Sequence, residues 1–295
     1  MAGDRFERCH PAVSFLFFAA AIVFGCIFMH PVYSAVGLAS AAIYYVLLAK
    51  RKGMKTFVFL IVLFIIMTVI NPLLNTTGET VLFYIFKRPY TAEALLYGAC
   101  LASIAVTVIL WAACFGKIMT EDKFTAVFSK LAPALSLLLV MVLRLIPGYF
   151  RKAKQLSDAR MSIGKGMKTA SKKYNIIAGT MILSSLTSWA LESGVETADS
   201  MRSRGYGATR RTSYQKLVMK AGDWVILAFT VAAIAVLIII AVKGGTSVNF
   251  TPSYEAAQIN GIGGIGAVIY LVFLWIPIFL HIKEEAAWHI LRSRI

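Results

Sequence analysis

Six apolar stretches of about twenty residues dominate this sequence and restrict what it can fold into. The hydrocarbon core of a bilayer is about 30 Å thick, and a helix of about 20 apolar residues crosses it. The composition agrees, because 59% of the 295 residues are hydrophobic and only 15% are charged. We therefore predict an all-α integral membrane protein with six spans, at about 11–29, 32–49, 56–74, 95–115, 224–242 and 262–280.

The positions of lysine and arginine predict the orientation of the chain, since cytoplasmic loops are enriched in both residues. With the N-terminus inside and six crossings, Lys87, Arg88 and Lys243 alone of the 30 basic residues fall outside. We therefore expect a plasma-membrane protein with both termini in the cytoplasm, in contact with the lipid bilayer. A nucleic-acid partner is not expected, because hydropathy already explains the charges and no aromatic-interleaved basic fold accompanies them.

The charge pattern also suggests three parts. Residues 1–116 form a predicted bundle of four spans, 117–222 a cytoplasmic or interfacial region, and 223–295 a two-span hairpin with a cytoplasmic tail. The middle part carries 18 lysines and arginines against 6 acidic residues. It also contains two short apolar runs, 131–143 and 176–191, which we interpret as interfacial helices. A tilted pair of helices that crosses the membrane and returns is the alternative.

Proline and glycine predict where the helices of the middle part begin and end. Pro147 suits the first turn of a helix over about 148–161, which Gly164 would stop. A second helix is predicted over about 179–204, with Gly205 just beyond its end, where a left-handed backbone is needed. Arg160 and Arg204 would lie at the ends of these two helices.

Three short motifs elsewhere have a structural interpretation. Proline at position 72 predicts that the third span ends within 71–75. The apolar segment 81–86 is too short to span, so we expect it at the outer interface or dipping back into the protein. The segment 261–266 fits GxGxxG but lacks a βαβ context, and it predicts close helix packing instead of nucleotide binding.

The sequence lacks the marks of catalysis. It has no Walker A, HExxH or GxSxG motif and no paired carboxylates, and its four cysteines form no CxxC pair. The spans have no charged residue away from their ends, which disfavours an ion-driven carrier. We therefore expect a protein that is not an enzyme and that binds no cofactor or metal itself.

Two arginine-centred elements stand out in the basic middle part, Ala159-Arg160-Met161 and Ser203-Arg204-Gly205. The guanidinium of arginine is a planar five-donor fork, and at a helix end it suits a carboxylate of another protein. This reasoning leaves two other roles open for these arginines. One is a local helix pair such as Asp199 with Arg202, and the other is binding of anionic lipid headgroups.

The whole layout resembles the transmembrane T component of energy-coupling factor transporters, which are ABC-type importers. The resemblance covers nearly the full length. The residues that carry it are Asn71-Pro72 followed by Gly78 and Val81-Leu82-Phe83, then Arg144-Leu145-Ile146-Pro147 leading to Ala159-Arg160, and then Glu196-Thr197-Ala198-Asp199-Ser200-Met201-Arg202-Ser203-Arg204-Gly205-Tyr206.

The resemblance implies a scaffold that couples two cytosolic ABC-type ATPases to a membrane S component, which captures a vitamin or a metal ion such as cobalt. ATP and magnesium would be bound by the ATPases. The family has an Ala-Arg-Gly element at the end of each coupling helix, whereas this chain has Met161 and Ser203 in place of one glycine and one alanine. The implied ATPase-docking residues are Ala159, Arg160, Arg202, Ser203, Arg204 and Gly205, and the implied S-component contacts are Ile182, Leu186, Trp189 and Met201.

The substrate would be contacted by another chain, so this sequence does not identify it. The alternative function is a stand-alone carrier or channel for a small molecule.

Overall fold

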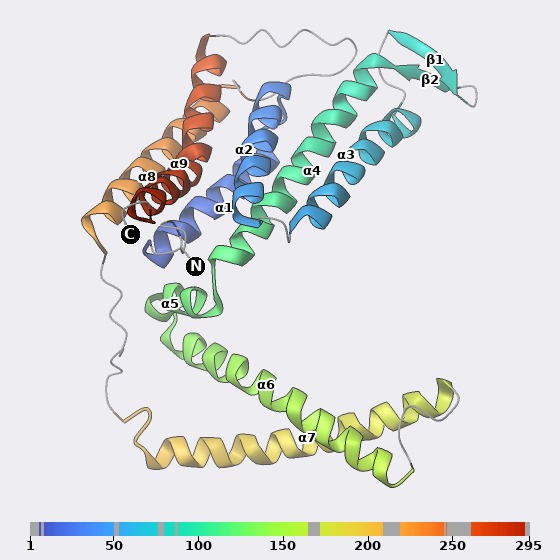
Figure 1. Cartoon of the computed structure of the whole chain (residues 1–295), viewed down its shortest axis with the longest axis vertical. Helices are drawn as coiled ribbons and strands as arrows, with labels where there is room; N and C mark the ends of the chain where they lie inside the picture. The colour runs from blue at the N-terminus through green and yellow to red at the C-terminus, as the bar shows by residue number, and fades with distance from the viewer. Residues whose placement is uncertain are drawn as a thin grey trace. The chain divides into compact units, whose positions relative to one another are not determined.

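A computed structural model describes residues 6, 9–49, 53–75, 80–85, 88–164, 172–208, 219–244, 246 and 261–292 (Figure 1). These residues are almost entirely helical, as predicted for an all-α protein. The helices are α1 (Pro11–Ile27), α2 (Pro31–Ala49), α3 (Met54–Leu74), α4 (Ala92–Ile118), α5 (Glu121–Leu131), α6 (Pro133–Ser162), α7 (Lys172–Ser203), α8 (Ala221–Val242) and α9 (Gly261–Arg292); the strands are β1 (Val81–Ile85) and β2 (Arg88–Thr91).

Six helices of the described residues are long and apolar enough to cross a membrane, namely α2, α3, α4, α6, α8 and α9. The chain is thus a multi-pass membrane protein, and the predicted number of six agrees. The members differ, however. Helix α1 is apolar but has only 17 residues, at the lower limit for a span, whereas α6 is long and apolar enough to cross a membrane.

The chain divides into two compact units. We call residues 1–124 with 218–295 the bundle unit, and residues 125–217 the central unit. The first contains α1–α4, α8 and α9, and the second contains α6 and α7.

Aromatic side chains hold the bundle unit together. Phe17 of α1 lies 5.7 Å from Trp111 of α4 and 4.9 Å from Phe273 of α9, measured between ring centroids. Tyr44 of α2 lies 5.8 Å from the same Trp111 ring. All four side chains are fully buried. Helices α1, α2, α4 and α9 therefore share one aromatic core, worth about 0.5–1.5 kcal/mol per ring pair beyond burial.

Helix α3 packs on α4 through a small residue. A Cβ at Gly98 would lie 2.7 Å from Cβ of Asn71, so glycine permits this approach. Apart from Leu60 and Pro72, no described residue of α3 is buried, as expected of a helix that faces lipid. The helix ends at Leu74, two residues after Pro72 and within the predicted segment.

Histidine side chains cap the first two helices. The Nδ1 atom of His10 accepts a hydrogen bond from the N–H of Ala12 at 3.2 Å, and Nδ1 of His30 accepts one from Val32 at 3.1 Å. Each histidine precedes a proline in the first turn, where its fixed φ suits the helix. Because Nδ1 must be unprotonated to accept, both caps need neutral imidazole.

The apolar segment expected at the outer interface or dipping back into the protein begins a β-hairpin. β1 pairs antiparallel with β2, as β-branched and aromatic residues favour. Glu93, near the start of α4, supports its base, since Oε1 accepts hydrogen bonds from the N–H and the hydroxyl of Thr80 at 3.3 and 2.6 Å. Residue 86 lies outside the described residues.

In the central unit, the predicted breaks within both helices are wrong. Pro147 does not begin a helix but lies inside α6, which starts at Pro133 and absorbs the apolar run 131–143. Gly179 likewise lies inside α7, which starts at Lys172. Each residue weakens a helix, by about 3 kcal/mol for proline and about 1 kcal/mol for glycine, but long helical sequence on both sides outweighs this.

Candidate functional sites

Helices α6 and α7 of the central unit cross antiparallel (Figure 1). Trp189 of α7 contacts α6 where they cross. Its ring lies 5.5 Å from that of Tyr149, edge to face at 79°. The Lys152 ammonium lies 5.5 Å from the same ring centroid, within the range of a cation–π interaction. One tryptophan thus contacts an aromatic and a cationic residue of the partner helix.

Arg160 lies near the C-terminal end of α6 and reaches across to α7. Its Nη2 donates to Sδ of Met181 at 3.3 Å, which is a weak acceptor. Its Nε is buried and has no hydrogen-bond partner among the described residues. The guanidinium is therefore half-buried, and one of its N–H groups has no partner among the described residues.

Arg204 lies at the end of α7, in a Schellman motif. The N–H of Tyr206 donates to the carbonyl of Met201 at 3.1 Å, and that of Gly205 donates to the carbonyl of Arg202 at 3.0 Å. Gly205 has φ +78°, which a residue with a Cβ rarely adopts, so its predicted left-handed position is confirmed. The motif fixes the backbone that presents Arg204, whose side chain is exposed.

The neighbouring residues of both elements are largely open to solvent. Ala159, Arg202 and Ser203 are exposed. Within the described part of the chain, neither Arg202 nor Asp199 takes part in an ion pair, so the local helix pair considered above does not form. The first helix also ends as predicted near Gly164, which has φ +72°.

The apolar residues implied to contact an S component differ in exposure. Ile182 is buried at 8% exposure, while Leu186, Trp189 and Met201 are half-buried. Ile182 therefore packs within the protein and is not available to a partner, whereas the other three side chains are partly accessible. Leu183, Leu191 and Val195 are each more than 60% exposed on the same helix. Sequence reasoning missed Tyr149, Lys152 and Met181, because their roles depend on where the two helices cross.

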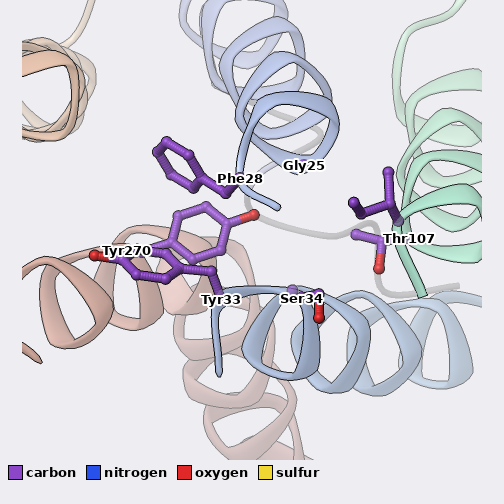
Figure 2. Close-up of a pocket in the computed structure, with 8 residues that line it drawn as sticks. Gly25, Phe28, Tyr33, Ser34, Thr107 and Tyr270 are labelled. Carbon is purple, nitrogen blue, oxygen red and sulfur yellow. The ribbon is translucent and has the colours of Figure 1, made fainter. Parts of the chain in front are cut away.

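A polar junction lies inside the bundle unit, where α1, α2, α4 and α9 meet (Figure 2). The hydroxyl of Tyr33 donates to the carbonyl of Gly263 at 2.9 Å and so ties α2 to α9. The hydroxyl of Tyr270 points toward Gly37, where an added Cβ would lie 3.3 Å away. The predicted close packing of the segment 261–266 thus occurs against the Tyr33 side chain, which contacts Gly263 and Gly266.

The junction contains no space wide enough for a water molecule. Its lining residues are Gly25, Phe28, Tyr33, Ser34, Gly37, Ile104, Thr107 and Tyr270. Oγ1 of Thr107 is buried there without a hydrogen-bond partner among the described residues. The junction is therefore a tight polar contact between helices and not a compartment for a small molecule.

No cluster of three or more potential metal ligands occurs among the residues that the structure describes. Comparison with models of known protein families and with curated proteins finds no match to this chain.

Proposed function

We propose that this chain is the T component of an energy-coupling factor importer in the plasma membrane, with both termini in the cytoplasm. It would join two ABC-type ATPases to a membrane S component that captures a vitamin or a metal ion. The chain itself would catalyse no reaction, and ATP and magnesium would be bound by the ATPases.

The observation that carries this proposal is the placement of two arginines near the ends of two crossing helices. Arg160 lies 11 residues beyond Tyr149, and Arg204 lies 15 residues beyond Trp189, which corresponds to about 16 Å and about 22 Å along the helix axes. Because the helices are antiparallel, the arginines lie on opposite sides of the crossing. Two separated cationic ends suit two separate partner subunits.

The two arginines differ in what a partner would supply. A carboxylate reaching Arg160 would replace the sulfur of Met181 with a charge-assisted acceptor and could also satisfy Nε. Arg204 is already solvated, so its gain would come from a bidentate pair on a rigid backbone. Removal of Arg160 should therefore affect both the central unit and docking, whereas removal of Arg204 should affect docking alone.

The exposed apolar residues of α6 and α7 suit contact with the S component or with lipid. They include Leu135, Leu138, Phe150, Ile176, Leu183, Leu191 and Val195. Such a density of exposed apolar side chains requires either the bilayer or another protein surface. In this proposal they meet the S component beside the membrane.

Purification from the native membrane tests the proposal. A T component should bring down two ATPase subunits and a small membrane protein, identifiable by mass spectrometry, and the complex should take up substrate only with ATP. The chain alone in liposomes should show no uptake driven by proton or sodium gradients. Gradient-driven uptake by the purified chain without ATPases would support the stand-alone carrier and contradict the proposal.

A further inference from the structure

An apolar groove runs between α8 and α9 on the bundle unit. Its volume is about 580 Å³. All of its lining residues are apolar, and they are Val225, Ile226, Phe229, Leu271, Val272, Trp275, Ile276, Phe279 and Leu280. Both helices are among the six that are long enough to span, so the groove opens at the depth of the hydrocarbon.

The length of the groove discriminates between possible occupants. From Leu271 to Leu280 the α9 axis rises about 14 Å, close to half of the roughly 30 Å hydrocarbon thickness. A membrane helix of a partner would run the whole thickness and would extend beyond the groove. A lipid acyl chain lies in one leaflet and matches this length.

One end of the groove has features of the membrane interface. Trp224 precedes the first lining residue of α8 and is 59% exposed, as is typical of tryptophan at headgroup depth. Lys283 of α9 is exposed and lies three residues after Leu280 and four after Phe279, on the groove face of the helix. Lys220, also exposed, precedes α8 at the same end.

Three acidic groups lie near this end of the groove. Glu284 is half-buried and lies seven residues after the buried Pro277, on the side of α9 that packs into the bundle. Asp223 is buried, and its Oδ2 accepts a hydrogen bond from the N–H of Lys220 at 3.1 Å, so it serves as a helix cap. Glu285 follows Lys283 by two positions, or about 200° around the helix, and therefore points away from it. Lys283 therefore shares the groove face of α9 and is placed to attract an anion at the interface.

We propose that this groove binds one anionic phospholipid, with an acyl chain between α8 and α9 and the phosphate beside Lys283. The apolar lining removes the acyl chain from contact with other lipids, and Lys283 holds the headgroup. This inference does not depend on the proposed coupling function, because it concerns only the bundle unit.

The test uses the full chain in nanodiscs that contain phosphatidylglycerol and phosphatidylcholine, followed by native mass spectrometry after mild release. We expect wild type to retain one phosphatidylglycerol. Val272→Phe should fill the groove and abolish retention. Val268→Phe is the matched control one turn away, since Val268 is 63% exposed but does not line the groove.

The headgroup is tested separately with Lys283→Gln, which should lower the preference for phosphatidylglycerol over phosphatidylcholine about fivefold. Lys243→Gln, an exposed lysine beyond the opposite end of α8, should leave it unchanged. Thermal unfolding of each variant verifies folding. Equal retention by wild type and Val272→Phe would overturn the proposal, as would a membrane protein that co-purifies and cross-links at Val272 in place of lipid.

Discussion

Glycine at position 266 leaves room for the hydroxyl of Tyr33, which holds α2 against α9. A methyl group at Gly266 would overlap that hydroxyl. We expect Gly266→Ala to lower the free energy of unfolding by about 1–3 kcal/mol, the usual cost of overpacking. Thermal unfolding in detergent measures this.

Two further variants make the Gly266 prediction specific. Gly116→Ala is a matched control, because nothing lies within 4 Å of the added Cβ. Adding Tyr33→Phe to Gly266→Ala removes the overlapping oxygen and should restore part of the lost stability. A Gly266→Ala protein as stable as the control would contradict the proposed contact.

His30 predicts a pH dependence of stability. Burial lowers the pKa of His30 below its ordinary 6.5, and its Nδ1 accepts the cap hydrogen bond from Val32. The unfolded chain therefore binds the proton more readily, so stability is fully present above pH 6.5 and falls as the pH drops below it. We expect the melting temperature to decrease between pH 7 and pH 5.

His30→Asn provides the control for this decrease. Asparagine is a good N-cap residue and does not titrate in this range, so the variant should keep the cap and show a smaller loss on acidification. An identical decrease in wild type and variant would assign the pH dependence to other groups.

At the scale of single residues, the sequence predicts features that depend on neighbouring residues in the chain, but not contacts between distant ones. Gly205 was predictable because its left-handed position follows from the helix end beside it. The hydrogen bond from Tyr33 to Gly263 was not, because it joins residues 230 positions apart. The buried Nε of Arg160 likewise depends on where α7 crosses α6.

Among the elements, Trp189 of α7 contacts two residues of α6 where the helices cross. Its contacts with Tyr149 and Lys152 together are worth about 1–2.5 kcal/mol. We expect Trp189→Ala to loosen this crossing, so that hydrogen exchange at the amides of both helices becomes faster. Leu191→Ala is the control, since Leu191 is 69% exposed. Equal exchange in the two variants would contradict a role for Trp189 in the crossing.

The elements also show which sequence signals mislead. Apolar length predicted five of the six candidate membrane helices among the described residues, because a span must satisfy its backbone internally, but it placed a span in α1 and none in α6. Pro147 and Gly179 were wrongly taken as helix starts, since a local breaker weakens a long helix without ending it. The segment 81–86 was judged by hydrophobicity alone, although its β-branched and aromatic residues favour the observed strand.

For the whole molecule, labelling tests the proposed orientation. In a background in which the four cysteines are replaced, single cysteines at Tyr84 of β1 and at Lys243 should react with an impermeant reagent from outside. Cysteines at Ser162 and Ser203, at the ends of α6 and α7, should react only after the membrane is permeabilised. Outside labelling at Ser162 would show that α6 crosses the membrane and would contradict the cytoplasmic placement of the central unit.

The measurement that tests the central claim most directly is retention of ATPases by a variant with Arg160→Ala and Arg204→Ala. Loss of one partner from a desolvated ion pair costs about 2–5 kcal/mol, so we expect retention to fall by more than tenfold. Arg151→Ala with Lys154→Ala is the matched control, because it removes two exposed charges from α6. Lysine at positions 160 and 204 should give intermediate retention, since it keeps the charge but loses the fork. Full retention of the ATPases by a normally inserted double alanine variant would contradict the account.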